Sequence, residues 1–281
     1  MKQNTNLKYD TYNDYASLQI VRDEEHELAW YYMCGSPRPC FTPDLLDNIL
    51  QWYDEVKHGQ EGQGIKYIVA ASKSVGAFNL GGDLGLFLQL IQNKDKVNLT
   101  KYAIACIDVL YNTYTSLDGR VTTISLVQGD ALGGGFEGAL SSDVLIAERS
   151  AKMGMPEILF NLFPGMGAFS LLSRKVGAVQ AEKMILGGKL YSAEEMYEAG
   201  LVDVLVEDGQ GEQAVYDYIK KENRAKNGIR SFRQAKMQSN PVTYSELENI
   251  VHIWVDAALR LDTKDLRMIE RLVKRQSAKV S

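Results

Sequence analysis

The sequence is poor in the residues from which metal sites and covalent catalytic sites are built. It contains three cysteines and three histidines among 281 residues, and their spacing fits neither a disulfide framework nor a metal-binding motif. We therefore expect Cys34, Cys40 and Cys106 to be reduced thiols. Each histidine is expected to be structural or solvated, so the sequence predicts no metal centre.

Long apolar segments and an excess of positive charge are also missing. No apolar run reaches the roughly 18 residues of a membrane-spanning helix. The polar N-terminal segment lacks the apolar region of a signal peptide, so we expect a cytoplasmic protein that is not embedded in a membrane. The net charge is −5, from 31 basic and 36 acidic residues, and no cluster of basic residues is interleaved with aromatics. Nucleic acid is therefore not an expected partner.

Several motifs of cofactor binding and nucleophilic catalysis are absent as well. The glycine-rich segments contain neither a G-x-x-x-x-G-K-[ST] phosphate loop nor a dinucleotide fingerprint with its later ribose-binding acid. No serine lies in a G-x-S-x-G turn. The sequence therefore predicts no nucleotide redox cofactor, and it favours acid/base chemistry over nucleophilic or metal catalysis.

What remains is a regular alternation of strand-like and helix-like segments. Short apolar runs of the kind found in strands occur at 17–21, 27–33, 67–72, 121–127, 143–148 and 201–207. Helical periodicity separates most of them and continues alone after residue 208. This pattern predicts an α/β core over 17–207 and a C-terminal helical subdomain over 208–281. Residues 1–16 are expected to be a flexible arm or an edge element.

Local signals also predict several boundaries. Thr42 before a proline and Asp83 before an apolar segment are suited to cap helices, and Ser192 opens a capping box. The strand at 67–72 is expected to be buried on both faces, as in a parallel sheet. The remaining expectations are a long helix over 99–117, a loop over 150–160 and a helical run over 241–273.

Two glycine-rich turns each precede a predicted helix: Gly81 with Gly82, and Gly133 with Gly134 and Gly135. Without a Cβ, the backbone N–H groups of such turns can approach a ligand closely, and a helix N-terminus favours negative charge. Two donors aimed at one oxygen would form an oxyanion hole, which stabilises charge developing on a carbonyl. Either turn alone also fits tight packing under a helix, and both interpretations stay open.

Two glutamates lie in unusually apolar sequence surroundings. Glu137 follows the glycine triplet within an apolar helix start, and Glu157 follows a proline and precedes three apolar residues. A buried carboxyl has its charged form disfavoured and can hold a proton near neutral pH. Two such groups are suited to acid/base chemistry on a neutral substrate. The alternative for each is an ordinary solvated or salt-bridged acid.

Four segments that include these turns and acids resemble the crotonase (enoyl-CoA hydratase/isomerase) superfamily. They are FNLGGDL at 78–84, ISLVQGDALGGGFEGAL at 124–140, MGMPEILFNLFPGMGA at 153–168 and AGLVDVLV at 199–206. The resemblance implies a spiral of ββα units and a homotrimer. It also implies a thioester carbonyl held by N–H groups from the Gly81–Gly82 pair and from Gly134, with Glu137 and Glu157 flanking C2 and C3. Retention of both acids favours hydration or dehydration over isomerase or hydrolase chemistry alone.

A narrower resemblance is to the diffusible-signal-factor synthases of this superfamily. It rests on FNLGGDLGLF at 78–87, ALGGGFEGAL at 131–140, PEILFNLFPGMGA at 156–168 and the tail segments IWVDAALRL at 253–261 and RLVKRQ at 271–276. It implies dehydration of 3-hydroxyacyl groups on acyl carrier protein to cis-2-enoyl products, followed by thioester hydrolysis to a free fatty acid used in quorum sensing. Trp254 and Leu272 would face the acyl tunnel, although plain core packing explains them equally well.

Two other functions stay open at this point. The first is a lyase of fatty acid degradation, an enoyl-CoA hydratase acting on coenzyme A thioesters. The second is a non-catalytic protein of the same fold that docks on a membrane sensor kinase. The sequence leaves open which glutamate is the acid, the direction of the reaction, the acyl chain length and the carrier. In both enzyme readings the thioester carrier is part of the substrate, and no further cofactor is expected.

Overall fold

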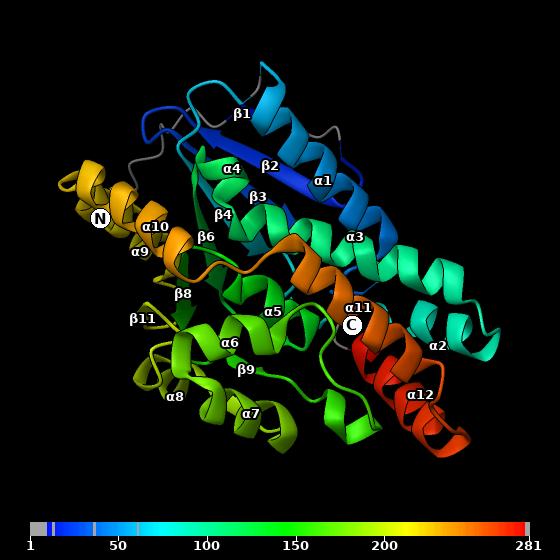
Figure 1. Cartoon of the computed structure of the whole chain (residues 1–281). Helices are drawn as coiled ribbons and strands as arrows, with labels where there is room; N and C mark the ends of the chain where they lie inside the picture. The colour runs from blue at the N-terminus through cyan, green and yellow to red at the C-terminus, as the bar shows by residue number, and fades with distance from the viewer. Residues whose placement is uncertain (1–9, 13–14, 36–37, 61, 279–281) are drawn as a thin grey trace.

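The computed structural model describes residues 10–12, 15–35, 38–60 and 62–278. At its centre is a seven-stranded sheet in the order β1-β2-β3-β4-β6-β8-β11 (Figure 1). Its strands are Asp10–Tyr12 (β1), Leu18–Asp23 (β2), Leu28–Met33 (β3), Tyr67–Ser72 (β4), Thr122–Val127 (β6), Val144–Glu148 (β8) and Val204–Val206 (β11). From β3 to β11 the neighbouring strands are parallel, whereas β1, β2 and β3 pair antiparallel.

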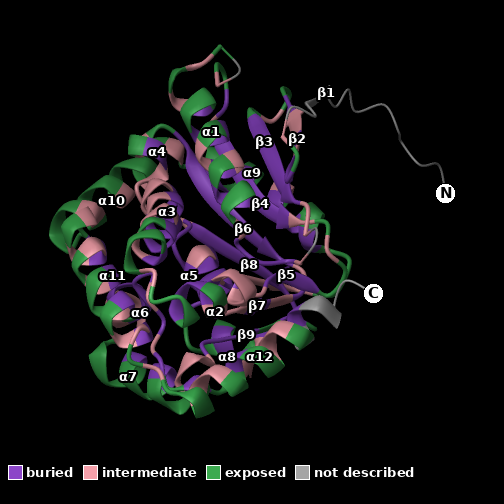
Figure 2. Ribbon diagram, turned by 90° about the vertical axis from the view of Figure 1, so that its right-hand side faces the viewer, coloured by how far each residue is buried: buried purple, intermediate pink, exposed green. Residues whose placement is uncertain are grey.

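The central strands are buried on both faces. Every residue of β6 and β8 is buried, and Figure 2 shows the strands in the buried colour between layers of helices. Strand β4 is buried except at its last residue and pairs with parallel neighbours on both sides. The prediction for residues 67–72 is thereby confirmed, because a strand that meets water on neither face reads as an apolar run.

A second, four-stranded sheet has the order β10-β9-β7-β5. Its strands are Ala77–Asn79 (β5), Asp130–Leu132 (β7), Lys152–Gly154 (β9) and Leu190–Ser192 (β10). These strands were not predicted from the sequence, and the loop predicted over 150–160 was wrong because it contains β9 and the 3-10 helix Glu157–Phe160 (η1). A strand of three residues is too short to show an alternation of polar and apolar side chains.

Helices cover both sheets and complete the fold. They are Pro43–His58 (α1), Leu84–Gln92 (α2), Lys96–Tyr114 (α3), Ser116–Gly119 (α4), Gly134–Leu140 (α5), Ala168–Val176 (α6), Ala178–Gly187 (α7), Ala193–Glu198 (α8), Gly211–Asn223 (α9), Lys226–Ser239 (α10), Tyr244–Ala258 (α11) and Thr263–Ala278 (α12). The predicted caps are confirmed: Thr42 accepts from Leu45 N, Asp83 accepts from the first turn of α2, and Ser192 forms the capping box.

Two predicted helices have other bounds than their apolar periodicity suggested. The helix expected over 99–117 stops at Tyr114, and Leu117 and Asp118 adopt positive φ angles of 49° and 60°, which a continuing right-handed helix excludes. The helical run expected over 241–273 is divided between α11 and α12. The strand expected over 201–207 is confined to β11.

The C-terminal helices pack on the α/β core at separate places. Ala214, Val215 and Ile219 of α9 form an apolar cluster with side chains of the main sheet, among them Trp30 and Leu126. Helix α11 packs along α3, and α12 packs against α2 and η1 (Figure 1). The last two helices of the described chain therefore lie near the segments that follow the glycine turns.

The first residues of the chain are described only in part. Asp10–Tyr12 form β1 at the edge of the main sheet, and residues 1–9 and 13–14 of the expected arm lie outside the described residues. Within the described ranges, no helix combines the length and the apolar character that crossing a membrane requires.

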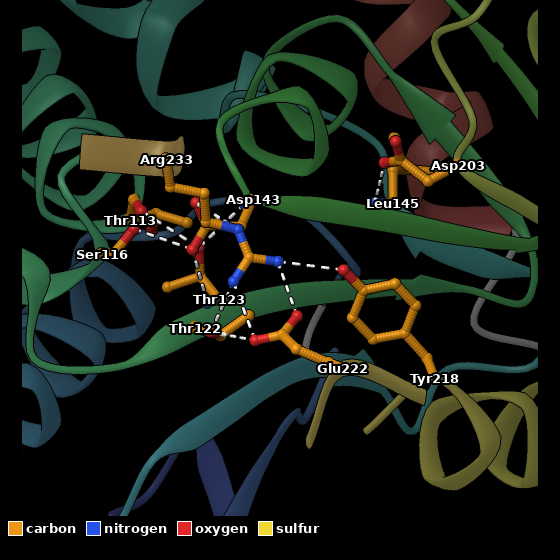
Figure 3. Close-up of polar contacts among 10 residues, drawn as sticks. All are labelled: Thr113, Ser116, Thr122, Thr123, Asp143, Leu145, Asp203, Tyr218, Glu222 and Arg233. Atoms are coloured by element: carbon orange, nitrogen blue, oxygen red, sulfur yellow. Dashed lines mark hydrogen bonds and ion pairs between the residues drawn. The ribbon is translucent and has the colours of Figure 1, made fainter. Parts of the chain in front are cut away.

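A polar network holds α10 to the N-terminal ends of the central strands (Figure 3). Arg233 of α10 forms an ion pair with Glu222 of α9 at 2.7 Å and approaches Asp143 at 3.7 Å. Its guanidinium also donates to Thr122 Oγ1 at 2.8 Å and to Tyr218 Oη at 2.9 Å. A cavity of about 850 Å³ lies beside this network. Since α10 has no buried residue among those the structure describes, polar contacts such as those of Arg233 attach it to the core.

Candidate active site

A small cavity brings together most of the residues predicted from the glycine and glutamate motifs. Its volume is about 80 Å³. Gly82, Gly134, Glu137, Glu157 and Trp254 line it, together with apolar and aromatic side chains of α2, α3 and η1. Among the described residues, the lining includes neither Gly81 nor Leu272.

The two glycine turns approach each other backbone to backbone at this cavity. A Cβ on Gly81 would lie 2.9 Å from Leu132 O and 3.2 Å from Gly134 N. A Cβ on Gly134 would lie 3.6 Å from Gly82 N and 2.8 Å from Met166 Sδ. Gly81 also has a φ of +91°, which side chains disfavour. The fold therefore requires glycine in both turns, because a side chain would not fit where the two backbones approach each other.

The hydrogen bonds of the turns distinguish between their N–H groups. Gly81 N donates to Asn79 Oδ1 at 2.8 Å, and Gly133 N donates to Gly154 O at 2.8 Å. Within the described part of the chain, the N–H groups of Gly82 and Gly134 have no acceptor. The prediction that named Gly81, Gly82 and Gly134 together is therefore narrowed to Gly82 and Gly134, because the Gly81 donor is already used.

Glu137 is held at the first turn of α5, where it is 1% exposed. Its Oε1 accepts hydrogen bonds from Met166 N at 2.8 Å and from Ala168 N at 2.9 Å. The pKa of Glu137 is raised from 4.5 to about 8, chiefly by burial and also by the charge of Glu157, while the two N–H groups oppose both effects. The carboxyl is therefore fixed in position and takes up a proton near neutral pH.

Glu157 begins the 3-10 helix η1 and faces the glycine triplet. A Cβ on Gly133 would collide with Glu157 Oε1, so this glycine leaves the space that the carboxyl occupies. Its other oxygen, Oε2, is buried and has no hydrogen-bond partner among the described residues. Burial raises the pKa of Glu157 from 4.5 to about 7. An unpartnered buried carboxyl at a cavity is poised to exchange a proton with a bound molecule.

Aromatic side chains form the apolar wall opposite the acids. Phe87 of α2 stacks on Trp254 of α11, with ring centroids 5.1 Å apart and an angle of 27° between the ring planes. A Cβ on Gly165 would lie 2.8 Å from Trp254 Cδ2, so the indole is also packed from behind. Trp254 thus lies at the cavity, whereas Leu272 is half-buried against the main core.

Sequence reasoning missed two residues that matter at the cavity. Tyr102 lines it, donates from Oη to Phe41 O at 2.7 Å and accepts there from Asp83 N at 2.7 Å. Phe87 was hidden among the buried positions of an apolar helix. Neither has a local signal, because both act through partners distant in sequence. Cys106 also lines the cavity, where burial raises its pKa to about 12 and keeps it a neutral thiol.

Comparison with known proteins finds similarity to one enzyme family over most of the chain. A sequence model of the family described as enoyl-CoA hydratase/isomerase matches residues 39–264. Among curated proteins, the fatty acid oxidation complex subunit alpha of Pseudomonas aeruginosa is 30% identical over 198 residues, which cover 70% of this chain and 27% of that protein. The chain therefore spans about a quarter of the length of this relative.

Solved structures share the fold across nearly the whole chain. An enoyl-CoA hydratase from Bacillus halodurans has a TM-score of 0.76 and 21% identity, covering 91% of this chain and all of that one (100%). DspI of Pseudomonas aeruginosa has a TM-score of 0.64 and 25% identity, covering 86% of this chain and 97% of that one. The α/β architecture expected from the sequence is thereby confirmed.

Proposed function

Because this chain belongs to the enoyl-CoA hydratase/isomerase family, we propose that its cavity binds an acyl thioester and that it is a lyase moving water across C2 and C3. One observation carries the proposal. Two buried glutamates with raised pKa values line the same cavity as two glycine N–H groups that have no acceptor in the described chain. The donors suit a thioester oxygen, and the acids suit the proton transfers at the neighbouring carbons.

The proposed mechanism uses each group once. Hydrogen bonds from Gly82 and Gly134 to the thioester oxygen would make the C2 proton more acidic. The ionised glutamate removes that proton, and the electron pair of the C2–H bond forms the C2=C3 double bond. The 3-hydroxyl leaves C3 with a proton from the other, neutral glutamate, so one water molecule is released. Hydration is the reverse, and in neither direction does a cofactor take part.

We further propose that the substrate is a 3-hydroxyacyl group on acyl carrier protein and that the product is a cis-2-unsaturated fatty acid signal. Support comes from the resemblance of the turns, the segment carrying Glu157 and the tail to the diffusible-signal-factor synthases. Release of the free acid requires a second step at the same donors. One ionised glutamate would remove a proton from water as the water oxygen attacks the thioester carbonyl. The C–S bond would then break, and the same glutamate would return the proton to the sulfur to give the carrier thiol.

We also propose that the protein works in the cytoplasm as a homotrimer. Support for assembly through α10 comes from its lack of buried residues among those described and from Phe232, which is 68% exposed. A large aromatic side chain exposed on a helix without buried residues suits a protein contact. In the non-catalytic alternative, the contact surface would serve a membrane sensor kinase instead.

Product analysis tests the proposed substrate. Purified protein would be given 3-hydroxyacyl-carrier protein, or the matching coenzyme A thioester, and the products identified by mass spectrometry. We expect cis-2-enoyl thioester and free cis-2-unsaturated acid from the carrier-protein substrate. If the protein only interconverts enoyl-CoA and 3-hydroxyacyl-CoA, it is an enoyl-CoA hydratase, and the proposal of a signal synthase is excluded. The absence of any turnover would favour the non-catalytic alternative.

The raised pKa values predict a bell-shaped dependence of rate on pH. Well below pH 7 both carboxyls are protonated and no base is present, and well above pH 8 both are ionised and no acid is present. Because the groups interact, the two limbs report the pair and not single residues. We expect maximal kcat/KM between about pH 7 and pH 8, because kcat/KM reports the pKa values of the free protein, measured in overlapping buffers at constant ionic strength. A rate that stays constant from about pH 5 to 10 would contradict the assignment of both acids.

A further inference from the structure

The last described helix reaches back to the first glycine turn through one side chain. Gln276 of α12 donates from Nε2 to Leu80 O at 3.1 Å and to Gly82 O at 3.1 Å. These carbonyls lie on either side of Gly81, and the described residues supply no other donor to them. Gln276 is 5% exposed, so water does not easily replace its carboxamide.

The surroundings of the turn show what this contact leaves free. The carbonyl of Gly81 accepts from Phe41 N at 2.8 Å, and Asp83 N donates to Tyr102 Oη at 2.7 Å. In a trans peptide the C=O and N–H groups point in opposite directions. With its carbonyl held by Phe41, the Gly81–Gly82 peptide directs the Gly82 N–H away from Phe41, and Gly82 lines the cavity.

The contacts of Gln276 therefore fall on the two peptides that flank the donor peptide. We propose that Gln276 is a positioning residue, which fixes the Gly81–Gly82 turn so that the Gly82 N–H meets the thioester oxygen. This inference rests on the proposed function. A carboxamide has two N–H donors on one nitrogen, so one side chain can bridge both carbonyls and hold the curvature of the turn.

The chemistry of the side chain argues against simple packing. A leucine would fill similar space but leave two carbonyls without a donor, and buried unpaired carbonyls carry a free-energy cost. The oxygen of Gln276, Oε1, is itself buried without a partner in the described chain. The carboxamide is therefore buried with its oxygen unpaired, and both of its hydrogen bonds go to the turn. This arrangement supports a role in positioning the turn.

Loss of the bridge would let the turn move relative to the second donor. Oxyanion stabilisation depends on donor distances of about 2.7–3.1 Å, and displacement by about 1 Å can cost on the order of 10²-fold in rate. We expect Gln276→Leu to lower kcat by about 10-fold or more, with KM within about 3-fold of the unmodified protein. Gln276→Glu, which keeps the size but donates no hydrogen bond when ionised, is expected to behave similarly.

Infrared spectroscopy reports the donor directly. The probe is a saturated acyl-CoA with a ¹³C-labelled carbonyl, bound to proteins that also carry Glu157→Gln so that the proton transfers are blocked. With Gln276 present, we expect the carbonyl band at a lower wavenumber than in water. With Gln276→Leu or Gln276→Glu, a smaller shift is expected, because only the Gly134 N–H still meets the oxygen in place. Lys274→Leu, at an exposed position of the same helix, is the matched control and should leave both kcat and the band unchanged.

The outcomes separate this inference from the proposed function. Unchanged kcat and an unchanged carbonyl band in both folded Gln276 variants would overturn the positioning role while leaving the lyase intact. A loss of kcat with an unchanged band would also overturn it, because the turn would then still present its N–H group. If the protein with native Gln276 neither turns over any thioester nor shifts the band, the proposed function fails, and the inference fails with it. Gln276→Glu keeps the test decisive if Gln276→Leu does not fold.

Discussion

Replacement of Glu157 by glutamine is expected to lower the rate by on the order of 10²-fold or more, and replacement of Glu137 to have a similar effect. Glutamine preserves the shape of each side chain but cannot exchange a proton at the catalytic step. The oxygen of a glutamine at 137 can still accept from Met166 N and Ala168 N, so the local structure is maintained. Initial rates with 3-hydroxyacyl thioester measure the loss.

Controls distinguish loss of chemistry from loss of structure. Glu182→Gln, at an exposed position of α7, should leave the rate unchanged. The double variant is expected to lose little more than the single ones, since residues that act as a unit are not additive. Retention of more than about half the rate in Glu157→Gln would rule out its proposed role.

Glu137→Gln, although it lowers the rate, should raise the stability of the folded protein at alkaline pH. The pKa of Glu137 is raised to about 8 in the folded chain, so the stability associated with its protonated form is present at low pH and is lost as pH rises through that value. Glutamine stays neutral and avoids this loss. We expect Glu137→Gln to unfold at a higher urea concentration than the unmodified protein near pH 9 and at a similar one near pH 5.

Arg233→Ala is expected to lower the free energy of unfolding by about 3–5 kcal/mol. The side chain of Glu222 is 5% exposed and that of Asp143 is 13% exposed, and both would lose their cationic partner. Burial by itself raises the pKa of Glu222, yet hydrogen bonds and charge from Arg233 hold it below its usual value. Urea unfolding near neutral pH, followed by circular dichroism, gives the change.

The design of this experiment uses the same helix for its control. Gln234→Ala removes an exposed neighbour and should change the free energy of unfolding by less than about 0.5 kcal/mol. Removal of both Arg233 and Glu222 should cost less than the sum of the single changes, because the carboxylate of Glu222 is then no longer left unpaired. A loss below about 1 kcal/mol for Arg233→Ala would show that solvent already screens the network.

Much of the fold could be predicted because its signals are local. Thr42, Asp83 and Ser192 cap helices through side chains that reach only two or three residues along the chain. The buried central strands are apolar throughout, and this property is visible without any partner. The three-residue strands of the second sheet were missed because their pairing, and not their composition, makes them strands.

In the candidate site, too, some residues could be predicted from local sequence patterns and others could not. Gly82, Gly134, Glu137 and Glu157 could be identified because a glycine turn before a helix and an acid among apolar residues are visible as short patterns. Gly81 could not be separated from Gly82, since the distinction depends on the hydrogen bond to Asn79 Oδ1. Nothing near Gln276 in sequence indicates its contacts with residues 194 and 196 positions earlier.

The long reach of α12 has a consequence for the order in which the protein is made. Synthesis proceeds from the N-terminus, so both glycine turns and both glutamates leave the ribosome well before Gln276. Until α12 docks, Leu80 O and Gly82 O lack their only donor among the described residues. A partly synthesised chain thus contains every glutamate and glycine of the candidate site but not the helix that completes the turn, so the site matures last.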